Sequence, residues 1–561
     1  MAGSISNAAS PSKIDRGWPF WAIITALSVM SILSALDVSA ISTAMPSMVE
    51  ELGSDIAYIW IANAYFLTMT AFQPLYGQTA NIFGRRSLTL LAVLFFAVGS
   101  AVSGPAENLG TLIAGRAIMG IGGGGVNVMI DMVLSDILPV RERPKYLGII
   151  FAVYTVAISL GPVIGGLLAE RVSWRWVFYL NLPISGVAFL LLLLALRMRY
   201  TKDTTRNSIK RVDFAGNALL VASIVSILLA LTWGGVVYAW SSWRTLLPLI
   251  LGFLGIAAFL FTQAMTWIPE PTMPLRIFSN RTTLAAFGLT FLHSTILYWT
   301  TYFLPLYFQA VLEYSPINSG VNLLPAIVTT MPFAILAGIG VSKLGRYRPF
   351  HFAGYGFAAI GFGLFSRLDE NSSTAYWAGV QCIAAVGIGV LTTTTLPAVQ
   401  APLEESDQAV ATATWAFVRS FGGVWGVAIP GAVFNTGVDL RLGQLEDESL
   451  RTLLSNGGAY GLASGEFMAS LDSRPVIRAQ VKDIYVQSLQ LCWQVGIAFT
   501  LAGFVVSFIV KEVPMRTELE TKFGLEGEKK GDIEATENLK EPTGGGGEGE
   551  GPSTIDGLDR T

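Results

Sequence analysis

The chain has 561 residues, of which 52% are hydrophobic and only 13% are charged, and its formal net charge is −3. Soluble domains carry about 25% charged residues, so this composition excludes a string of soluble domains and indicates a protein that crosses a membrane several times. The two cysteines, Cys382 and Cys492, both lie in apolar segments, so no disulfide framework is indicated.

Fourteen apolar segments are expected to cross the bilayer as helices, because each approaches the length that a spanning helix needs. Lys and Arg concentrate in alternate short loops, which places those loops and the N-terminus in the cytoplasm. An even number of spans returns the C-terminus to the same side. The expected spans are 20–44, 57–80, 88–104, 111–137, 146–168, 175–196, 213–235, 245–267, 283–310, 320–341, 350–366, 377–400, 409–434 and 488–510.

The first expected span carries an acidic residue, Asp37, with Ser39, Ser42 and Thr43 close by in the sequence. Ionisable residues inside spans are costly and are functional candidates by default. A carboxylate there is expected to bind and release a proton, because burial disfavours its charged form. The alternative is a structural partner for a buried base.

A short basic turn follows the second span, with Gly77 near the helix end and Gly84, Arg85 and Arg86 in the turn itself. Its positive charge is expected to keep the turn in the cytoplasm. The stretch resembles the signature loop of the major facilitator superfamily, G-x-x-x-D-R-x-G-R-R. In this chain Asn81 stands where that family usually has Asp.

Asp136, at the cytoplasmic end of the fourth span, is the nearest acidic candidate to this turn. An ion pair between Arg85 and Asp136 would hold the inner face closed when the outer face opens. The resemblance implies that the loop's own Asp normally helps, so Asn81 predicts a weaker closure than in relatives. The alternative is that Arg85 and Arg86 only set the topology through their charge.

Arg116 lies in the fourth span, before a glycine-rich stretch. An unpaired guanidinium in lipid is implausible, so Arg116 is expected to face the interior and to pair. The stretch resembles the fourth-helix motif of the same superfamily, which is linked to proton coupling. This resemblance implies that Arg116 tunes the charge state of Asp37. A fixed structural ion pair is the alternative.

The fifth span contains Ala157, Gly161, Pro162, Gly165 and Gly166. Proline removes a backbone hydrogen bond and kinks a helix, and the glycines give a bare face for close helix packing. The pattern resembles the antiporter motif of drug exporters, G-x-x-x-G-P-x-x-G-G, with Ala157 at the first position. The resemblance implies export, and helix packing alone is the alternative.

Three further stretches, at 174–183, 233–235 and 415–426, resemble the fourteen-span drug:proton antiporters of fungi. The implied fold is an all-α polytopic membrane protein, with two six-helix bundles as a repeat and two extra central helices. The expected parts are a cytoplasmic tail at 1–19, a bundle at 20–196, a basic loop with the extra helices at 197–282, a second bundle at 283–510 with an external loop at 435–487, and a disordered acidic cytoplasmic tail at 511–561.

The fold implied by the resemblance places the substrate between the two bundles, near the middle of the membrane. Polar and aromatic residues of the spans are the candidates to line this cavity, although such aromatics more often serve in packing. They are Asn63, Tyr65, Gln73, Asn127, Tyr154, Tyr302, Gln309, Trp415 and Arg419. Asn371 begins a glycosylation sequon in an outer loop.

The sequence has no metal-ligand cluster, nucleophile elbow or phosphate loop, so neither an enzyme nor an ATP-driven pump is expected. The resemblance implies a monomeric exporter of hydrophobic or amphipathic organic compounds in the plasma membrane. Its energy would come from the proton gradient, without a cofactor, and its partners would be a small-molecule substrate, protons and the lipid bilayer, with no nucleic acid. The alternatives are an uptake or siderophore-complex transporter, a transporter-like sensor, and a location in the vacuolar membrane.

Overall fold

The computed structural model describes residues 17–52, 59–198, 204–235, 237–265, 268, 270–455 and 457–518. Most of the tails expected at 1–19 and 511–561 lies outside the described residues, as does the side chain of Ser42. Helices make up nearly all the regular structure in the described part of the chain. This agrees with the all-α class expected from the apolar segments.

Six long helices form what we call the N-terminal half. They are α1 (Trp18–Leu52), α2 (Ile59–Phe83), α3 (Arg85–Ser103), α4 (Leu109–Ile137), α5 (Arg143–Arg171) and α6 (Arg175–Ala195). A connecting region follows, with the short helices α7 (Thr205–Arg211) and η1 (Leu275–Phe278) flanking two long helices. These two, the inserted pair, are α8 (Phe214–Trp233) and α9 (Trp243–Gln263).

Six further long helices form the C-terminal half. They are α10 (Arg281–Leu306), α12 (Leu324–Leu344), α13 (Arg348–Phe365), α14 (Thr374–Gln400), α15 (Glu405–Asp439) and α19 (Pro475–Ile509). Shorter elements stand between them. These are η2 (Tyr307–Val311), α11 (Pro316–Val321), η3 (Leu442–Gln444), α16 (Glu448–Leu454), α17 (Gly458–Gly461) and α18 (Gly465–Ser470).

The described residues therefore contain fourteen helices of 18 residues or more, and eleven of them are long and apolar enough to cross a bilayer. The other three are α2, α10 and α13. Polar residues such as Gln73 in α2 and His293 in α10 lower the hydropathy of the first two, and both side chains are buried inside the protein. Burial against protein makes such residues tolerable in a spanning helix.

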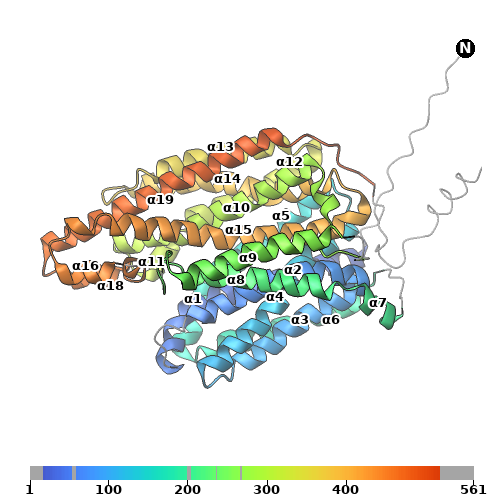
Figure 1. Cartoon of the computed structure of the whole chain (residues 1–561), viewed down its shortest axis with the longest axis horizontal. Coiled ribbons are helices and arrows are strands. Elements are labelled where there is room, and N and C mark those ends of the chain that lie inside the picture. The colour runs from blue at the N-terminus through green and yellow to red at the C-terminus, as the bar shows by residue number, and fades with distance from the viewer. Residues whose placement is uncertain are drawn as a thin grey trace, which may run out of the picture.

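The two halves lie one above the other in Figure 1, with most of the N-terminal half below. They meet where α5 packs against α12 and where α2 and α4 pack against α15. Glycine permits the close α5–α12 approach, because a Cβ at Gly338 would collide with the carbonyl oxygen of Pro144. We call this surface the inter-half interface.

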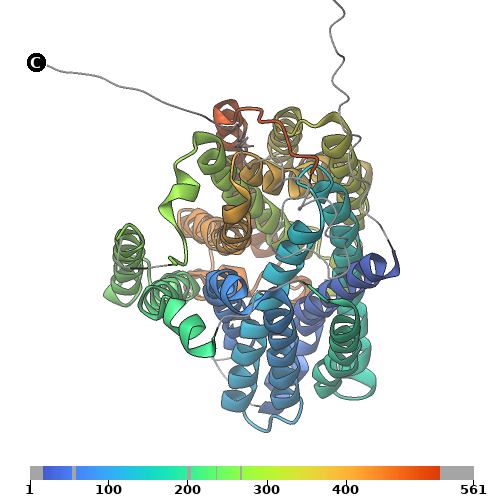
Figure 2. The ribbon, with the colours of Figure 1, turned by 90° about the vertical axis from the view of Figure 1, so that its right-hand side faces the viewer.

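The inserted pair lies along one flank of this interface, as the view along the helices shows (Figure 2). Helix α8 packs against α2 and α15. The amide of Asn217 in α8 donates a hydrogen bond of 2.7 Å to Gln78 Oε1 in α2. Gln78 in turn donates to the carbonyl of Glu270 in the loop after α9. Buried polar groups need such partners, so this network fixes the inserted pair on the N-terminal half.

The bundle of helices has two opposite ends. The Arg85 end is where α2 meets α3, and α7 and the start of α1 lie there too, at the right of Figure 1. The Glu51 end is the opposite one, where α1 ends and α16 and α18 lie. At the Arg85 end, Arg276 of η1 forms an ion pair of 2.7 Å with Asp407. Arg276 donates hydrogen bonds to this carboxylate, and they raise the pKa of Arg276.

The connection between the last two long helices is shorter than the segment expected at 435–487. Helix α15 continues to Asp439 and α19 begins at Pro475, so the connection covers 440–474. It is folded against the C-terminal half, because the ring of Tyr460 contacts Phe303 and the Tyr485 hydroxyl donates to the carbonyl of Ala459. Polar residues at 435–439 and 475–487 lower the hydropathy of these helix ends, so they were not expected to be part of the long helices.

Candidate functional site

A buried ion pair occupies the interior of the N-terminal half. Arg116 Nη1 in α4 lies 2.7 Å from Asp37 Oδ2 in α1, and each residue is 1% exposed. Asn181 of α6 donates to Asp37 Oδ1 at 3.2 Å. Arg116 also donates to the carbonyl of Ile61 at 3.0 Å and lies 4.4 Å from the ring centre of Tyr65. Both charges are thus compensated, which their burial requires.

Sequence reasoning missed Asn181 as a partner of this pair. The residue lies within the stretch 174–183, whose resemblance was noted, but one neutral amide in an apolar helix gives little signal. Tyr65 had been placed among the cavity candidates. In the structure Tyr65 is fully buried beside Arg116, where its ring face attracts the guanidinium.

The glycine face of α5 packs directly on the helix that carries Asp37. A Cβ at Gly165 would collide with the carbonyl oxygen of Ala40, and one at Gly161 would lie 3.0 Å from the Ala40 nitrogen. At Gly166, in contrast, the nearest neighbouring atom would be 3.9 Å away. Close packing between α1 and α5 therefore requires Gly161 and Gly165 and does not require Gly166.

Pro162 lies inside α5, and its carbonyl accepts a hydrogen bond of 3.0 Å from Thr43 Oγ1 in α1. Proline cannot donate a backbone hydrogen bond within the helix, and this side-chain bond adds a second link between α5 and α1. Ala157, where the exporter motif has glycine, is buried and packs with Ala35 and Leu36 of α1. A methyl group fits at this position.

The signature loop is a tight turn at Gly84, whose φ of 85° suits glycine. Arg85 Nε lies 2.6 Å from Asp136 Oδ2, and Arg85 Nη1 donates to Asn81 Oδ1 at 2.7 Å. Arg86 donates to the carbonyl of Leu193. Asn81 therefore takes part as a neutral acceptor. The Arg85–Asp136 pair joins α3 to α4 within the N-terminal half, so it does not itself bridge the two halves.

The signature loop reaches the other half through Gly77. A Cβ on Gly77 would collide with the Cβ of Ala413 in α15. The absence of a side chain at this position thus allows α2 and α15 to touch at the Arg85 end. Opening of this end would separate these two residues.

We expect each single charge reversal, Arg85→Asp or Asp136→Arg, to lose transport, because each leaves like charges facing each other at a buried site. The double variant exchanges the two charges and is expected to recover part of the lost transport. Efflux measured at equal surface expression checks this. If efflux by the double variant is no faster than efflux by the single variants, a direct pair between Arg85 and Asp136 is not what transport requires.

Arg143, at the start of α5, makes several polar contacts with the C-terminal half. Its Nη1 donates to Gln400 Oε1 at 2.9 Å and to Gln408 Oε1, both in the C-terminal half, and its Nη2 donates to the carbonyl of Ser135. Arg141 donates to the carbonyl of Ser342 in α12 at 2.8 Å. The sequence marked both arginines only as positive loop residues, because position in a loop does not show what a side chain contacts.

Three cavity candidates lie at or near the inter-half interface. Gln73 donates to Ser420 Oγ at 3.0 Å, from α2 to α15. Arg419 of α15 lies 3.5 Å from Asp131 in α4. Trp415 is 1% exposed and donates to Thr395 Oγ1 at 3.1 Å, so its indole nitrogen is satisfied inside the C-terminal half.

The other candidates are spread over both halves. Asn127 contacts Ser34 and the Met69 sulfur in the interior of the N-terminal half. Tyr302 stacks on Tyr298, with ring centres 6.3 Å apart, and is 38% exposed. The last three are the half-buried residues Asn63, Tyr154 and Gln309, the last of which donates to Ser319 at the Glu51 end.

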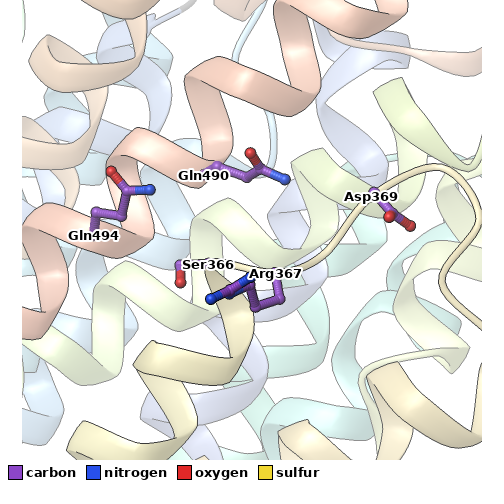
Figure 3. A pocket seen from close by; sticks show the side chains of 5 residues that line it. All are labelled: Ser366, Arg367, Asp369, Gln490 and Gln494. Carbon is purple, nitrogen blue, oxygen red and sulfur yellow. The ribbon is translucent and has the colours of Figure 1, made fainter.

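A polar cavity of about 440 Å³ lies at the Glu51 end of the C-terminal half (Figure 3). Ser366, Arg367 and Asp369, which follow α13, line it together with Gln490 and Gln494 of α19. It contains none of the nine candidates and is separate from the inter-half interface. The nearby sequon residue Asn371 is exposed.

The described residues contain no group of three or more His, Cys, Asp or Glu that could hold a metal ion. Both cysteines are free thiols. His293 and His351 are buried, and each ring contacts a backbone carbonyl at 3.1 Å.

Comparison with known proteins identifies the family. Residues 27–427 match the model of the Major Facilitator Superfamily. The chain is 46% identical over 527 residues to "Efflux pump FUS6" of Gibberella fujikuroi, covering 94% of this chain and 95% of that protein. It is 42% identical over 523 residues to "MFS efflux transporter aclA" of Aspergillus oryzae, covering 93% and 94%.

Solved structures share the fold at low sequence identity. The human organic anion transporter MFSD10 aligns with a TM-score of 0.58 and 14% identity, covering 88% of this chain and 100% of that chain. The proton:xylose symporter XylE aligns with a TM-score of 0.53 and 14% identity, covering 80% and 95%. The resemblance seen in the signature loop is thus confirmed: the chain belongs to the major facilitator superfamily, and it is a multi-pass membrane transporter and not an enzyme.

Proposed function

We propose that the protein exports hydrophobic or amphipathic organic compounds, of the kind that fungi make as secondary metabolites, in exchange for protons. Several relatives are named efflux pumps, and one, 46% identical over 514 residues, is an "Acurin A biosynthesis cluster MFS-type transporter" of Aspergillus aculeatus. The observation that carries the coupling to protons is the buried Asp37–Arg116 pair beside the glycine face of α5.

The fourteen long helices would each span the membrane of the cell surface, with the Arg85 end in the cytoplasm. The positive-inside rule supports this orientation. Basic residues gather in the connections and in the first turns of the adjoining helices at that end, among them Arg85, Arg86, Arg141, Arg143 and Lys145. The two halves would act as the moving parts, with the inserted pair between them, and one chain would suffice for transport.

Asp37 would bind the transported proton. Protonation removes the negative charge that faces Arg116, whose guanidinium keeps the carbonyl of Ile61 and the ring of Tyr65. The attraction between α1 and α4 then weakens, and α1 can shift against α5 along the Gly161 and Gly165 contacts. A ligand shifts the equilibrium between two conformations only if its affinity for them differs. Here the ligand is the proton, and the weaker attraction between Asp37 and Arg116 after protonation makes its affinity for the two positions of α1 differ.

Alternating access would open one end of the inter-half interface at a time. Arg141, Arg143 and Gly77 all contact the C-terminal half at the Arg85 end. These contacts correspond to a state closed toward the cytoplasm. Opening toward the cytoplasm would require them to break together.

The test is efflux of rhodamine 6G from yeast cells that lack their own drug exporters. Expression of the protein is expected to speed efflux, and a protonophore is expected to remove this gain because it dissipates the proton gradient. Cells with an empty vector measure the background. Efflux that continues undiminished in the protonophore, at equal ATP content, would contradict proton coupling.

A further inference from the structure

A second acidic residue of the spans, Asp131, lies where the two halves meet. Asp131 is in α4, is 2% exposed, and its Oδ2 lies 3.5 Å from Arg419 Nη2 in α15. This ion pair crosses the inter-half interface. The Asp37–Arg116 pair, in contrast, lies wholly within the N-terminal half.

The two pairs also differ in how firmly they are held. Asp37 has a partner at 2.7 Å and an amide at 3.2 Å, whereas Asp131 has, within the described residues, this single ion pair at 3.5 Å. Arg419 stands over the rings of Trp415 and Phe151, 4.4 and 5.4 Å from their centres. Its Nη1 has no hydrogen-bond partner among the described residues. The compensation of the Asp131 charge is therefore incomplete.

Other titratable groups lie on the helices packed around this pair, and the charged ones have partners of their own. Arg85 and Asp136 pair with each other, Asp37 pairs with Arg116, and Arg143 contacts the two glutamines and Glu405. The buried His293 of α10 contacts the carbonyl of Ile388. The same helices also carry tyrosines, among them Tyr65, Tyr76, Tyr154 and Tyr298. Arg419 is thus the cation that faces Asp131.

We propose that Asp131 binds a proton in each transport cycle, and that its ionised form, paired with Arg419, holds the cytoplasmic end closed. The proposal rests on the proposed proton exchange and adds a second site to it. Protonation removes the charge of Asp131 and with it the attraction between α4 and α15. The helices can then part at the Arg85 end at lower cost, since an uncharged acid no longer attracts the half-buried guanidinium of Arg419.

The direction of this effect agrees with exchange of a proton for an exported compound. A proton from the acidic outside binds the Asp131 carboxylate, the pair breaks, and the cytoplasmic end opens. The acid then meets cytoplasmic water and releases the same proton there, while the organic compound binds from the cytoplasm. The ionised Asp131 pairs with Arg419 again as that end closes, and the compound leaves on the outer side. One proton enters by way of Asp131 for each closure, in addition to any carried by Asp37, and no other reactant is needed.

The experiment measures opening of the cytoplasmic end and proton coupling separately. Ser135 is 3% exposed and accepts a hydrogen bond of 3.0 Å from Gln400 across the interface. A Ser135→Cys reporter, with Cys382→Ala and Cys492→Ala, is labelled with a membrane-impermeant maleimide in inside-out vesicles. Asp131→Asn is compared with the parent, with Arg419→Gln, and with Glu107→Gln, which removes an exposed carboxylate far from the interface.

We expect Asp131→Asn and Arg419→Gln to raise the labelling rate several-fold and Glu107→Gln to leave it unchanged. In proteoliposomes, Asp131→Asn is expected to lose the stimulation of rhodamine 6G transport by a pH gradient and to keep transport down a dye gradient. Unchanged labelling in both interface variants, or full pH stimulation in Asp131→Asn, would overturn the proposal. A parent protein without pH stimulation would instead refute the proposed proton exchange, and labelling alone would then decide the role of the pair.

Discussion

Replacing Asp37 with Asn is expected to reduce proton-driven efflux to the level of cells with an empty vector, while most of the protein still reaches the membrane. The amide oxygen can still accept from Arg116, which keeps its bond to Ile61 and its contact with Tyr65. The amide cannot take up and release a proton, so its charge no longer changes during the cycle. Dye efflux normalised to surface expression gives the measurement.

Arg116→Ala provides the comparison for this variant. It leaves the carboxylate of Asp37 buried with Asn181 as its remaining partner. Breaking one side of a buried ion pair costs about 3–5 kcal/mol. The yield of folded protein should fall further than in Asp37→Asn, because there Arg116 keeps the amide oxygen, the Ile61 carbonyl and the Tyr65 ring as partners. An Asp37→Asn variant that still transports dye against its gradient, with a proton gradient as the driving force, would remove Asp37 from the mechanism.

Adding one methyl group at Gly165 is expected to damage the transporter more than adding one at the next residue. In Gly165→Ala the new Cβ collides with the backbone carbonyl of Ala40, which cannot rotate away, so α1 and α5 must separate. Overpacking of this kind costs about 1–3 kcal/mol. Because α1 carries Asp37, the shift should also lower efflux strongly. The midpoint of thermal unfolding in detergent and the rate of dye efflux are the two measurements.

Gly166→Ala is the matched control, because the same substitution meets its nearest neighbour at 3.9 Å. We expect its unfolding midpoint to stay near that of the parent protein. Equal loss of stability in the two variants would mean that the packing of α1 on α5 does not set the requirement for glycine. Equal stability in both, with efflux intact, would contradict the close approach seen at Gly165.

Much of the helix layout could be predicted from the apolar segments alone. The sequence also predicted that Arg116 would need a partner, since an unpaired charge is too costly inside a membrane protein, and Asp37 is that partner in the structure. The ends of α15 and α19 were harder to predict. Their outer turns are polar because they contact the folded connection 440–474, which hydropathy cannot distinguish from a loop.

The contacts between the two halves could not be predicted, because they depend on how distant helices meet. Arg143 carried only the signal of a basic loop residue, yet it contacts two glutamines of the other half. Tyr65 was expected to line the cavity because it is polar and lies in a span, and its contact with Arg116 was not foreseen. Asp131 and Arg419 are both charged residues of expected spans. Their pairing could not be predicted, because nothing in the sequence joined α4 to α15.

The most direct test of the central claim is proton movement in proteoliposomes that contain the purified protein and the pH dye pyranine. An inward gradient of rhodamine 6G, applied at equal pH on both sides, is expected to drive protons out of the vesicles, so that the lumen becomes alkaline. Asp37→Asn should abolish this change, and Glu107→Gln should retain it. Dye uptake by the parent protein without any change in the lumenal pH would contradict exchange of protons for the organic compound.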